Sequence, residues 1–272
     1  MAVLRGRVLA IGGSDPSGGA GIQADLKTIA AYGAYGMTAL TALTVQDTTA
    51  VHEVMVLPAG FVRAQIAGVM ADLGADAVKT GMLGDAAVMT AVCDALAAAA
   101  PVPLVVDPVL RATAGPRLLA EPALAVLIRR LLPMATLLTP NLPEAEALTG
   151  MEIPDLAAMH RAAAALRELG VPAVLLKGGH MTGTTVVDLL ATADGIEAFA
   201  APRLDQRHTH GTGCTLASAI ASGLAQGMAL RDAVLRARGY VRAAIAGAPG
   251  LGAGHGPLNH AAWLDPPAGS DW

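Results

Sequence analysis

The cysteine at position 214 lies in a glycine-rich turn that leads into a helical run. Residues 210–215 are His-Gly-Thr-Gly-Cys-Thr, and a helical pattern follows from Leu216 to Gln226. Backbone N–H groups at a helix N-terminus and the positive end of the helix dipole attract anions. The same field is expected to lower the pKa of the Cys214 thiol below its usual value of about 8.5. The turn therefore predicts an anion site, such as one for phosphate, although a plain glycine turn around a small buried thiol would have a similar sequence.

Four further polar residues stand at the ends of predicted strands or the starts of predicted helices. Asp107 and Lys177 each follow or end an apolar, strand-like run. Asn141 and Glu144 follow another, where they could face a metal ion or simply cap the helix that Pro143 would begin. The carboxyl ends of parallel strands meet at one rim of a sheet. Carboxylates suit Mg²⁺, lysine suits phosphate, and a helix N-terminus suits a phosphoryl group in transfer, so the set predicts phosphoryl transfer from a nucleotide.

Strand-like and helix-like runs alternate along the chain. An apolar run at 8–11 leads into a glycine-rich loop at 12–21 and a helix at 22–32, and strands are expected at 37–45 and 51–57. The loop has neither the G-x-G-x-x-G spacing nor the lysine of a P-loop, so it indicates only a close approach of the backbone to a small ligand. The order of elements predicts a single doubly wound α/β domain over residues 1–272.

The composition argues against several classes of protein. Of the 272 residues, 54% are hydrophobic, 3% aromatic and 15% charged, with a net charge of −4. The sequence has no basic run and few aromatic side chains, so nucleic acid is not expected as a partner. The two cysteines cannot form a disulfide framework, and the N-terminus lacks the apolar core of a signal peptide. The longest uncharged runs contain polar residues, and the histidines lack zinc-site spacing. We therefore expect a cytoplasmic protein with no membrane partner and no zinc.

Beyond these patterns, motifs along nearly the whole chain are similar to those of a known family. They are GGSDPSGGAGIQADLKT (12–28), TALTVQDT (41–48), KTGML (79–83), VVDPV (105–109), TPNLPEAEALTG (139–150), LLKGGH (175–180), HTHGTGCTLASAIASGLAQG (208–227) and GAGHGPLNH (252–260). The chain resembles the hydroxymethylpyrimidine/phosphomethylpyrimidine kinases of thiamine biosynthesis, within the ribokinase-like superfamily.

The resemblance implies a fold, a reaction and a set of ligands. The fold would be a ribokinase-like three-layer α/β/α domain with a mostly parallel central sheet and a small β flap, assembled as a homodimer. The reaction would be ATP-dependent phosphorylation of 4-amino-5-hydroxymethyl-2-methylpyrimidine, and then of its monophosphate to the diphosphate. ATP and Mg²⁺ would be the cofactors, with the use of a monovalent cation left open.

The same resemblance implies roles for individual residues. The pyrimidine would hydrogen-bond to Gln46 in a pocket completed by Gly13, Asp25, Met82 and Val109. Mg²⁺ would be organised by Asp107 and Glu144. The ATP phosphates would lie near Lys177, Thr212 and Asn141, and an anion hole would be formed by Gly211, Thr212 and Gly213. Many ribokinase-like sugar kinases carry an aspartate after this turn. Here Cys214 stands in that place, as in the pyrimidine kinases, and we interpret it as the base or as a group that positions the substrate hydroxyl.

Three alternatives remain at this point. A pyridoxal kinase is the nearest, although an amide such as Gln46, which both donates and accepts, favours an aminopyrimidine. A cysteine hydrolase or acyltransferase would use Cys214 with His208 or His210, and would leave the carboxylates and Lys177 without a role. A pyrimidine sensor would have no use for a kinase set. Arg111, in a loop that departs from the family pattern, could meet a phosphate but is more typical of a solvated residue.

Overall fold

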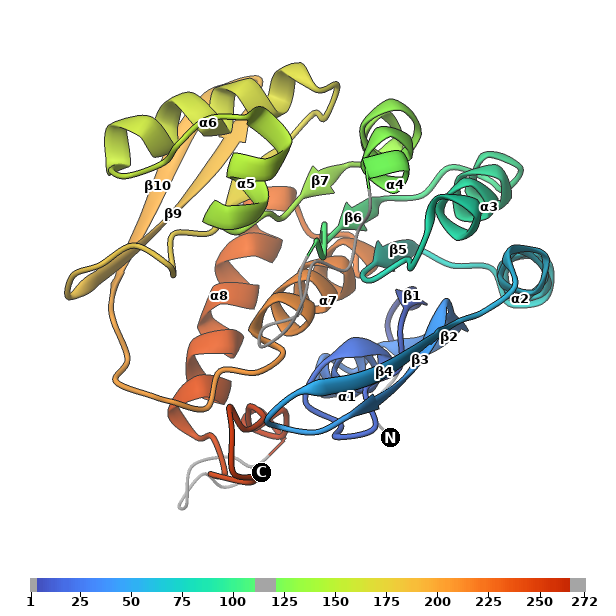
Figure 1. Cartoon of the computed structure of the whole chain (residues 1–272), viewed down its shortest axis with the longest axis horizontal. Coiled ribbons are helices and arrows are strands. Elements are labelled where there is room, and N and C mark those ends of the chain that lie inside the picture. Colours follow the sequence, from blue (N-terminus) through green and yellow to red (C-terminus); the bar gives the residue numbers. More distant parts are fainter. Residues whose placement is uncertain (1–3, 111–120, 265–272) are drawn as a thin grey trace.

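A central sheet forms the middle layer of the molecule, with helices on both sides of it (Figure 1). The structure is a computed structural model that describes residues 4–110 and 121–264. Within those residues the sheet has eight strands in the order β10-β9-β8-β7-β6-β5-β1-β2. In chain order they are β1 (Arg7–Gly12), β2 (Tyr35–Leu40), β5 (Ala77–Thr80), β6 (Leu104–Val106), β7 (Leu137–Leu138), β8 (Val174–Leu176), β9 (Thr185–Thr192) and β10 (Gly195–Pro202).

Most of the sheet is parallel. The pairs from β2 through β1, β5, β6 and β7 to β8 are parallel, and β9 and β10 extend the edge as an antiparallel hairpin. The central strands β5 to β8 are short and buried throughout; β6, β7 and β8 are wholly apolar, and β5 carries Lys79 and Thr80. Their carboxyl ends therefore open onto one rim, where ligands bind in sheets of this kind.

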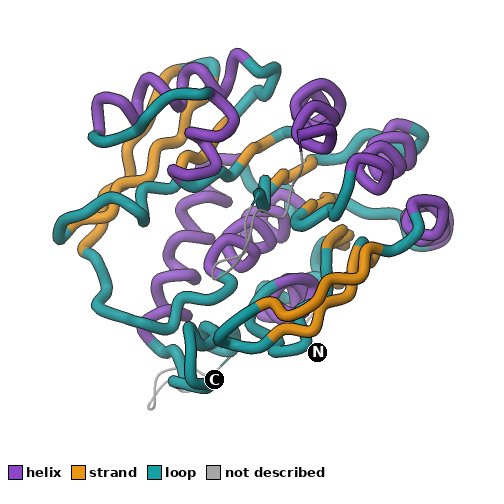
Figure 2. The backbone as a smooth tube through the Cα atoms, in the orientation of Figure 1, coloured by secondary structure: helices purple, strands orange, loops and turns teal. Residues whose placement is uncertain are grey.

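Helices cover both faces of the sheet (Figure 2). Alternate residues of β1 belong to two apolar clusters, Leu9 and Ile11 to one and Val8 and Ala10 to the other. The first cluster includes α2 (Ala59–Asp72), α3 (Ala86–Ala97), α4 (Glu121–Val126), α5 (Leu142–Thr149) and α6 (Leu156–Glu168). The second includes α1 (Gly21–Ala31), α7 (Thr212–Ala225) and α8 (Leu230–Ala246). These two layers confirm the predicted three-layer α/β/α fold.

The predicted strand at 37–45 is wrong in one respect, because the chain forms two strands there. After β2 the backbone N–H of Thr41 donates to Gly12 O (3.0 Å) and its hydroxyl to Met82 O (2.6 Å), which turns the chain out of the main sheet. The following strand β3 (Ala42–Gln46) pairs antiparallel with β4 (Val51–Val56) in a separate two-stranded sheet. This small sheet is the predicted flap.

Two helices differ from what the sequence pattern predicts. The helix expected at 216–226 begins four residues earlier, at Thr212, so the Thr-Gly-Cys triplet forms its first turn. The helix α4 continues as a π-helical turn at Leu127–Leu131, which a periodicity of 3.6 residues cannot reveal. Arg111 lies outside the described residues. Among residues 4–110 and 121–264, no helix combines the length and apolar character needed to span a membrane.

Candidate functional site

A cleft of about 1230 Å³ opens at the carboxyl ends of the parallel strands. Every site residue predicted from the sequence lines it: Gly13, Asp25, Gln46, Met82, Asp107, Val109, Asn141, Glu144, Lys177, Gly211, Thr212, Gly213 and Cys214. These residues come from seven separate stretches of the chain. The parallel strands bring most of them to one rim, and the flap strand β3 and the start of α7 add the rest. The cleft is large enough for two ligands of the size of a nucleotide and a small ring.

The N-terminus of α7 approaches other backbone very closely. Gly211 precedes the helix with φ +83°, and a Cβ there would lie 1.8 Å from the carbonyl oxygen of Gly19 in the first glycine-rich loop. A Cβ on Gly213 would lie 3.3 Å from both Lys177 Nζ and Asp107 Oδ2. Since first-turn N–H groups have no acceptor within their own helix, they are available at this point to an anion. Position 211 therefore requires glycine, and a side chain at position 213 would press on Lys177 and Asp107.

Lys177 lies between two carboxylates at the centre of the cleft. Its Nζ is 3.3 Å from Asp107 Oδ1, and the side chains are only 14% and 4% exposed. Burial alone would lower the pKa of Lys177, but Asp107 and Glu144 outweigh it and raise the pKa. Burial raises the pKa of Glu144 to about 7; Lys177 lowers it in part, and Asp107 raises it. The cluster thus places one ammonium and two carboxylates at the cleft, groups that suit a phosphate and a cation.

Asn141 and Glu144 form a reciprocal cap at the start of α5. The Asn141 side-chain oxygen accepts from the Glu144 N–H (2.9 Å), and Glu144 Oε2 accepts from the Asn141 N–H (2.8 Å). Of the two alternatives open for Asn141, the structure therefore shows the helix cap. Glu144 combines the cap with a place on the wall of the cleft, since one carboxylate can accept from several donors.

The carboxylates fit a magnesium ion that a nucleotide brings with it. The described part of the chain contains no cluster of three or more Asp, Glu, His or Cys side chains that could form a complete cage. Mg²⁺ commonly takes only one or two carboxylates and completes its shell with waters and substrate phosphates. Asp107 and Glu144 supply this partial donor set beside the turn at Gly213.

The expectation of a lowered thiol pKa at Cys214 is wrong. Burial raises the pKa of Cys214 to about 11, and the Asp25 and Asp107 carboxylates raise it further, against a smaller lowering by Lys79. Lys79 and a hydrogen bond from the Gly21 backbone lower it only in part. The two candidate bases of a hydrolase are also engaged elsewhere, since His208 Nδ1 accepts from the Gly256 N–H (3.0 Å) and His210 Nε2 lies 2.8 Å from Asp15 Oδ2. The site therefore lacks the cysteine–histidine pair of a nucleophilic enzyme.

A buried ion pair that the motif analysis missed lies at the floor of the cleft. Lys79 Nζ is 2.8 and 2.9 Å from the two carboxylate oxygens of Asp25, and Ser218 Oγ donates to the same carboxylate (2.7 Å). Both charged side chains are fully buried. Asp25 lines the cleft as predicted, but its carboxylate is held by these two donors. The sequence contains one signal for this pair, because Lys79 is a charged residue inside a strand that is buried on both faces.

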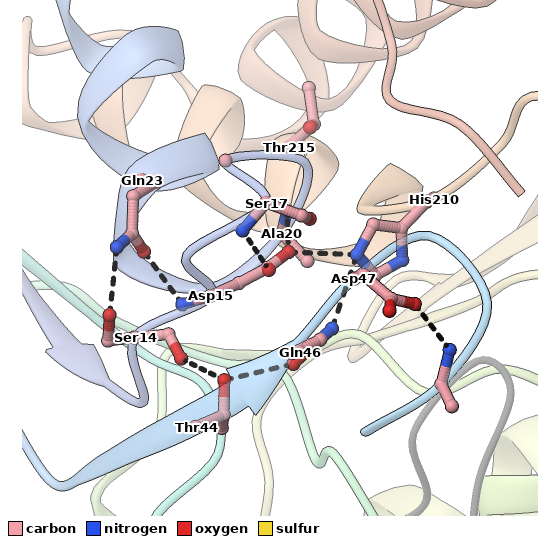
Figure 3. Close-up of polar contacts among 12 residues, drawn as sticks. Ser14, Asp15, Ser17, Ala20, Gln23, Thr44, Gln46, Asp47, His210 and Thr215 are labelled. Carbon is pink, nitrogen blue, oxygen red and sulfur yellow. Dashed lines mark hydrogen bonds and ion pairs between the residues drawn. The ribbon is translucent and has the colours of Figure 1, made fainter. Parts of the chain in front are cut away.

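The substrate side of the cleft is built from the first loop and the flap. A Cβ on Gly13 would lie 2.7 Å from Met82 Cε, so these two predicted pocket residues are neighbours. Gln46 ends β3 at a bulge in the pairing with β4. Its side chain faces His210 and Thr44 (Figure 3). The pair of Asp15 with His210 was not predicted, although Asp15 stands in the quoted 12–28 motif.

The comparison with protein families decides the relationship of the chain. The family model for phosphomethylpyrimidine kinase matches residues 15–259. The chain belongs to the phosphomethylpyrimidine kinase family. A hydroxymethylpyrimidine/phosphomethylpyrimidine kinase of Streptomyces coelicolor is 49% identical over 253 residues, which cover 93% of each protein. A thiamine biosynthesis bifunctional protein of Geobacter sulfurreducens is also 49% identical over 256 residues, but the match spans 94% of this chain and about half (52%) of that protein.

Solved structures of two kinase types share this fold. A phosphomethylpyrimidine kinase of Clostridium difficile matches with a TM-score of 0.78 and 40% identity, over 88% of this chain and 99% of that one. A pyridoxal kinase of Staphylococcus aureus in complex with AMP-PCP and pyridoxal matches with a TM-score of 0.88 and 33% identity, over 96% and 95%. The ribokinase-like fold is thereby confirmed for this member of the phosphomethylpyrimidine kinase family. The sequence relatives favour a pyrimidine kinase over a pyridoxal kinase.

We predict that Lys79→Met destabilises the protein by about 3 to 5 kcal/mol, because it leaves the Asp25 carboxylate buried and unpaired. Urea unfolding at pH 7 measures the loss. The loss should shrink as pH falls, because a lone buried Asp25 takes up a proton in the folded state and its charge then disappears.

The matched control is the double variant Asp25→Asn/Lys79→Met, which removes the charge but keeps an acceptor for Ser218. It should recover most of the lost stability. Equal losses in the single and double variants would show that Lys79 contributes through packing and not through the ion pair.

Proposed function

We propose that this protein is an ATP-dependent kinase that phosphorylates 4-amino-5-hydroxymethyl-2-methylpyrimidine and then its monophosphate, in thiamine biosynthesis. The observation that carries the proposal is the convergence of Lys177, Asp107, Glu144 and the α7 turn at one end of the cleft, with Gln46 and Met82 in the same cleft. The first group suits phosphates, and the second suits a small polar ring. The names of the relatives give the same two-step substrate class.

In the proposed arrangement the ATP phosphates lie against Lys177 and the N-terminus of α7. First-turn N–H groups following Gly211 receive the negative charge of the transferring phosphoryl group, and the adjacent Lys177 ammonium adds a full charge. The Thr212 hydroxyl donates to Thr209 O (2.7 Å), and its backbone N–H makes only a longer contact with the same oxygen (3.3 Å), so the backbone N–H is the part that we assign to the anion hole. Asn141 contributes chiefly by fixing the start of α5, which holds Glu144 in place.

Asp107 and Glu144 are the residues that we assign to Mg²⁺. When bound, the ion would neutralise phosphate charge that the single ammonium of Lys177 cannot balance. Because Lys177 now lies 3.3 Å from Asp107, we expect it to turn from that carboxylate toward the nucleotide phosphates on binding.

Cys214 is better suited to positioning the substrate than to acting as a base that is a thiolate before substrate binds. Its pKa of about 11 keeps the thiol protonated at neutral pH. Phosphoryl transfer with a loose transition state places more weight on alignment than on early proton removal. We therefore assign Cys214 to the wall that faces the substrate hydroxymethyl group. The thiol would act as a base only where bound substrate changes its surroundings.

The pyridoxal alternative rests on the shared fold of the Staphylococcus aureus pyridoxal kinase. The amide of Gln46 argues against it, because an aminopyrimidine presents a ring nitrogen acceptor next to an amine donor, and an amide can satisfy both at once. A pyridine ring with a phenolic oxygen and an aldehyde lacks the amine donor. Gln46 is therefore the residue that we expect to discriminate between the aminopyrimidine and pyridoxal.

A homodimer is part of the proposal. The outer side of the flap exposes three apolar side chains, Leu43 (43% exposed), Val45 (55%) and Met55 (59%), and Leu43 and Met55 are paired across the two strands. An apolar patch on a two-stranded sheet is costly to leave in water. A second copy covering this face would bury it and would stiffen the flap that carries Gln46.

We predict that the protein converts ATP to ADP in the presence of hydroxymethylpyrimidine and of its monophosphate, and that kcat/KM for pyridoxal is at least about tenfold lower, because Gln46 then leaves a polar partner unsatisfied. A coupled ADP-release assay with the three substrates in parallel measures this. Turnover of pyridoxal at equal or higher kcat/KM would overturn the substrate assignment, and no turnover of any of the three would overturn the kinase assignment.

For Cys214 we expect Cys214→Ser to retain more activity than Cys214→Ala, with the alanine variant about 10- to 100-fold below wild type, since the hydroxyl preserves a polar contact with the substrate. The kcat of wild type should stay level from pH 7 to 9. If an initial thiolate with a pKa of about 11 were required, kcat would instead rise about tenfold for each pH unit in this range.

A further inference from the structure

The residue directly before the anion-binding turn also contacts the residue assigned to the pyrimidine. His210 Nε2 lies 2.8 Å from Asp15 Oδ2 and 3.4 Å from the terminal amide of Gln46 (Figure 3). Asp15 and His210 are 1% and 7% exposed, so this contact is shielded from water. It joins the first glycine-rich loop, the flap and the start of α7 at a single imidazole nitrogen.

Asp15 fixes which atom of the imidazole carries hydrogen. The two carboxylate oxygens accept from the Ser17 N–H (2.9 Å) and the Ala20 N–H (2.8 Å). Burial alone would raise the pKa of Asp15, but the hydrogen bonds from His210, Ser17 and Ala20 outweigh it and lower the pKa. An ionised carboxylate can only accept, so His210 Nε2 must be the donor in the 2.8 Å contact.

Thr44 places the opposite constraint on the other end of the amide. Its hydroxyl donates to the backbone oxygen of Ser14 (2.9 Å) and also lies 3.3 Å from the Gln46 amide. A hydroxyl has one hydrogen, and the shorter contact with an acceptor uses it. Thr44 Oγ1 can therefore only accept from Gln46.

These two constraints select one orientation of the Gln46 amide. As drawn in Figure 3, the amide nitrogen faces His210, which would set two donors 3.4 Å apart and two acceptors together at Thr44. Exchanging the amide nitrogen and oxygen removes both conflicts, because the nitrogen then donates to Thr44 and the oxygen, in place of a second donor, faces the His210 N–H. Since the one Nε2 hydrogen is used mainly by Asp15 at 2.8 Å, His210 acts on Gln46 chiefly by excluding the amide N–H from its side, with the 3.4 Å contact as the weaker branch of a shared hydrogen bond. In this orientation the Gln46 amide retains one free N–H on its nitrogen and one free lone pair on its oxygen.

We propose that Asp15 and His210, together with Thr44, form a positioning network that locks the Gln46 amide in this orientation and so determines which ring the kinase accepts. The network rests on the proposed function, in which the ring binds at Gln46. A 4-aminopyrimidine offers an acceptor at the ring nitrogen and a donor at the amine. The corresponding 4-oxopyrimidine offers a donor and an acceptor in the reverse order, which a locked amide cannot match and a free amide can.

The experiment compares kcat/KM for 4-amino-5-hydroxymethyl-2-methylpyrimidine with that for its 4-oxo analogue. Wild type should prefer the amino compound by at least about 100-fold, because the reversed pair leaves two buried polar groups unsatisfied. His210→Leu removes the donor, and the preference should fall about tenfold or more. His210→Gln, whose amide nitrogen can take the place of Nε2, should keep the preference within about threefold of wild type.

The kinetics of His210→Leu can also contradict the proposal. An equal loss of kcat/KM for both pyrimidines in His210→Leu, with the preference unchanged, would overturn the lock and leave His210 a purely structural role. Thermal unfolding of the three proteins identifies a variant that is simply misfolded; if His210→Leu fails to fold, the proposal then rests on His210→Gln and on the measurement that follows.

The lock can also be tested without turnover, by ¹⁵N NMR of the His210 imidazole in the wild-type protein. A hydrogen on Nε2 is expected, and a bare Nε2 would overturn the proposal. If wild type phosphorylates neither pyrimidine while Nε2 carries its hydrogen, the proposed function is wrong and the side-chain network itself stands.

Discussion

The site depends on a contact between two stretches of backbone. Gly211 lies so close to Gly19 that an added Cβ would come within 1.8 Å of its carbonyl oxygen. This contact fixes the start of α7 against the loop that follows β1, and Asp15 and His210 tie the same two segments through side chains at 2.8 Å. The anion-binding turn is thereby held at the mouth of the parallel strands, where Lys177 and Asp107 end their own runs. Under the proposed function, a shift of this turn would move the phosphate site relative to the ring site, because His210 directly precedes Gly211 and contacts Gln46.

Electrostatics decide how the two ends of the cleft differ. At the phosphate end, Lys177, Asp107 and Glu144 are loosely paired, with a 3.3 Å contact and a Glu144 pKa raised to about 7, so they can rearrange around a nucleotide. At the floor, Lys79 and Asp25 are tightly paired and fully buried, and they hold their shape. The thiol of Cys214 interacts with charged groups of both clusters and has a pKa raised to about 11, because burial outweighs the lowering by Lys79 and the Gly21 backbone. Under the proposed function, the loosely paired cluster would serve the phosphates, and the tightly paired one would hold the shape of the cleft.

The sequence predicted the layers of the fold and the residues that line the cleft. It did not predict the pKa of the Cys214 thiol or which charged side chains form pairs. Strand ends such as Asp107 and Lys177 could be placed because parallel strands share a rim. The break between β2 and β3 could not, since it depends on Thr41 hydrogen-bonding to Gly12 and Met82, residues remote in the sequence. The pKa of Cys214 was predicted in the wrong direction because local sequence reports a helix terminus but not the depth of burial. The Lys79–Asp25 and Asp15–His210 pairs join residues 54 and 195 positions apart, which spacing alone cannot relate.

The most direct test of this account is a crystal structure of the protein with Mg²⁺, AMP-PCP and 4-amino-5-hydroxymethyl-2-methylpyrimidine bound together. The account predicts the terminal phosphate at the first turn of α7 beside Lys177, the ion between that phosphate and the carboxylates of Asp107 and Glu144, and the hydroxymethyl group facing Cys214 with the ring on Gln46. A terminal phosphate bound away from α7, or a pyrimidine that does not contact Gln46, would contradict it.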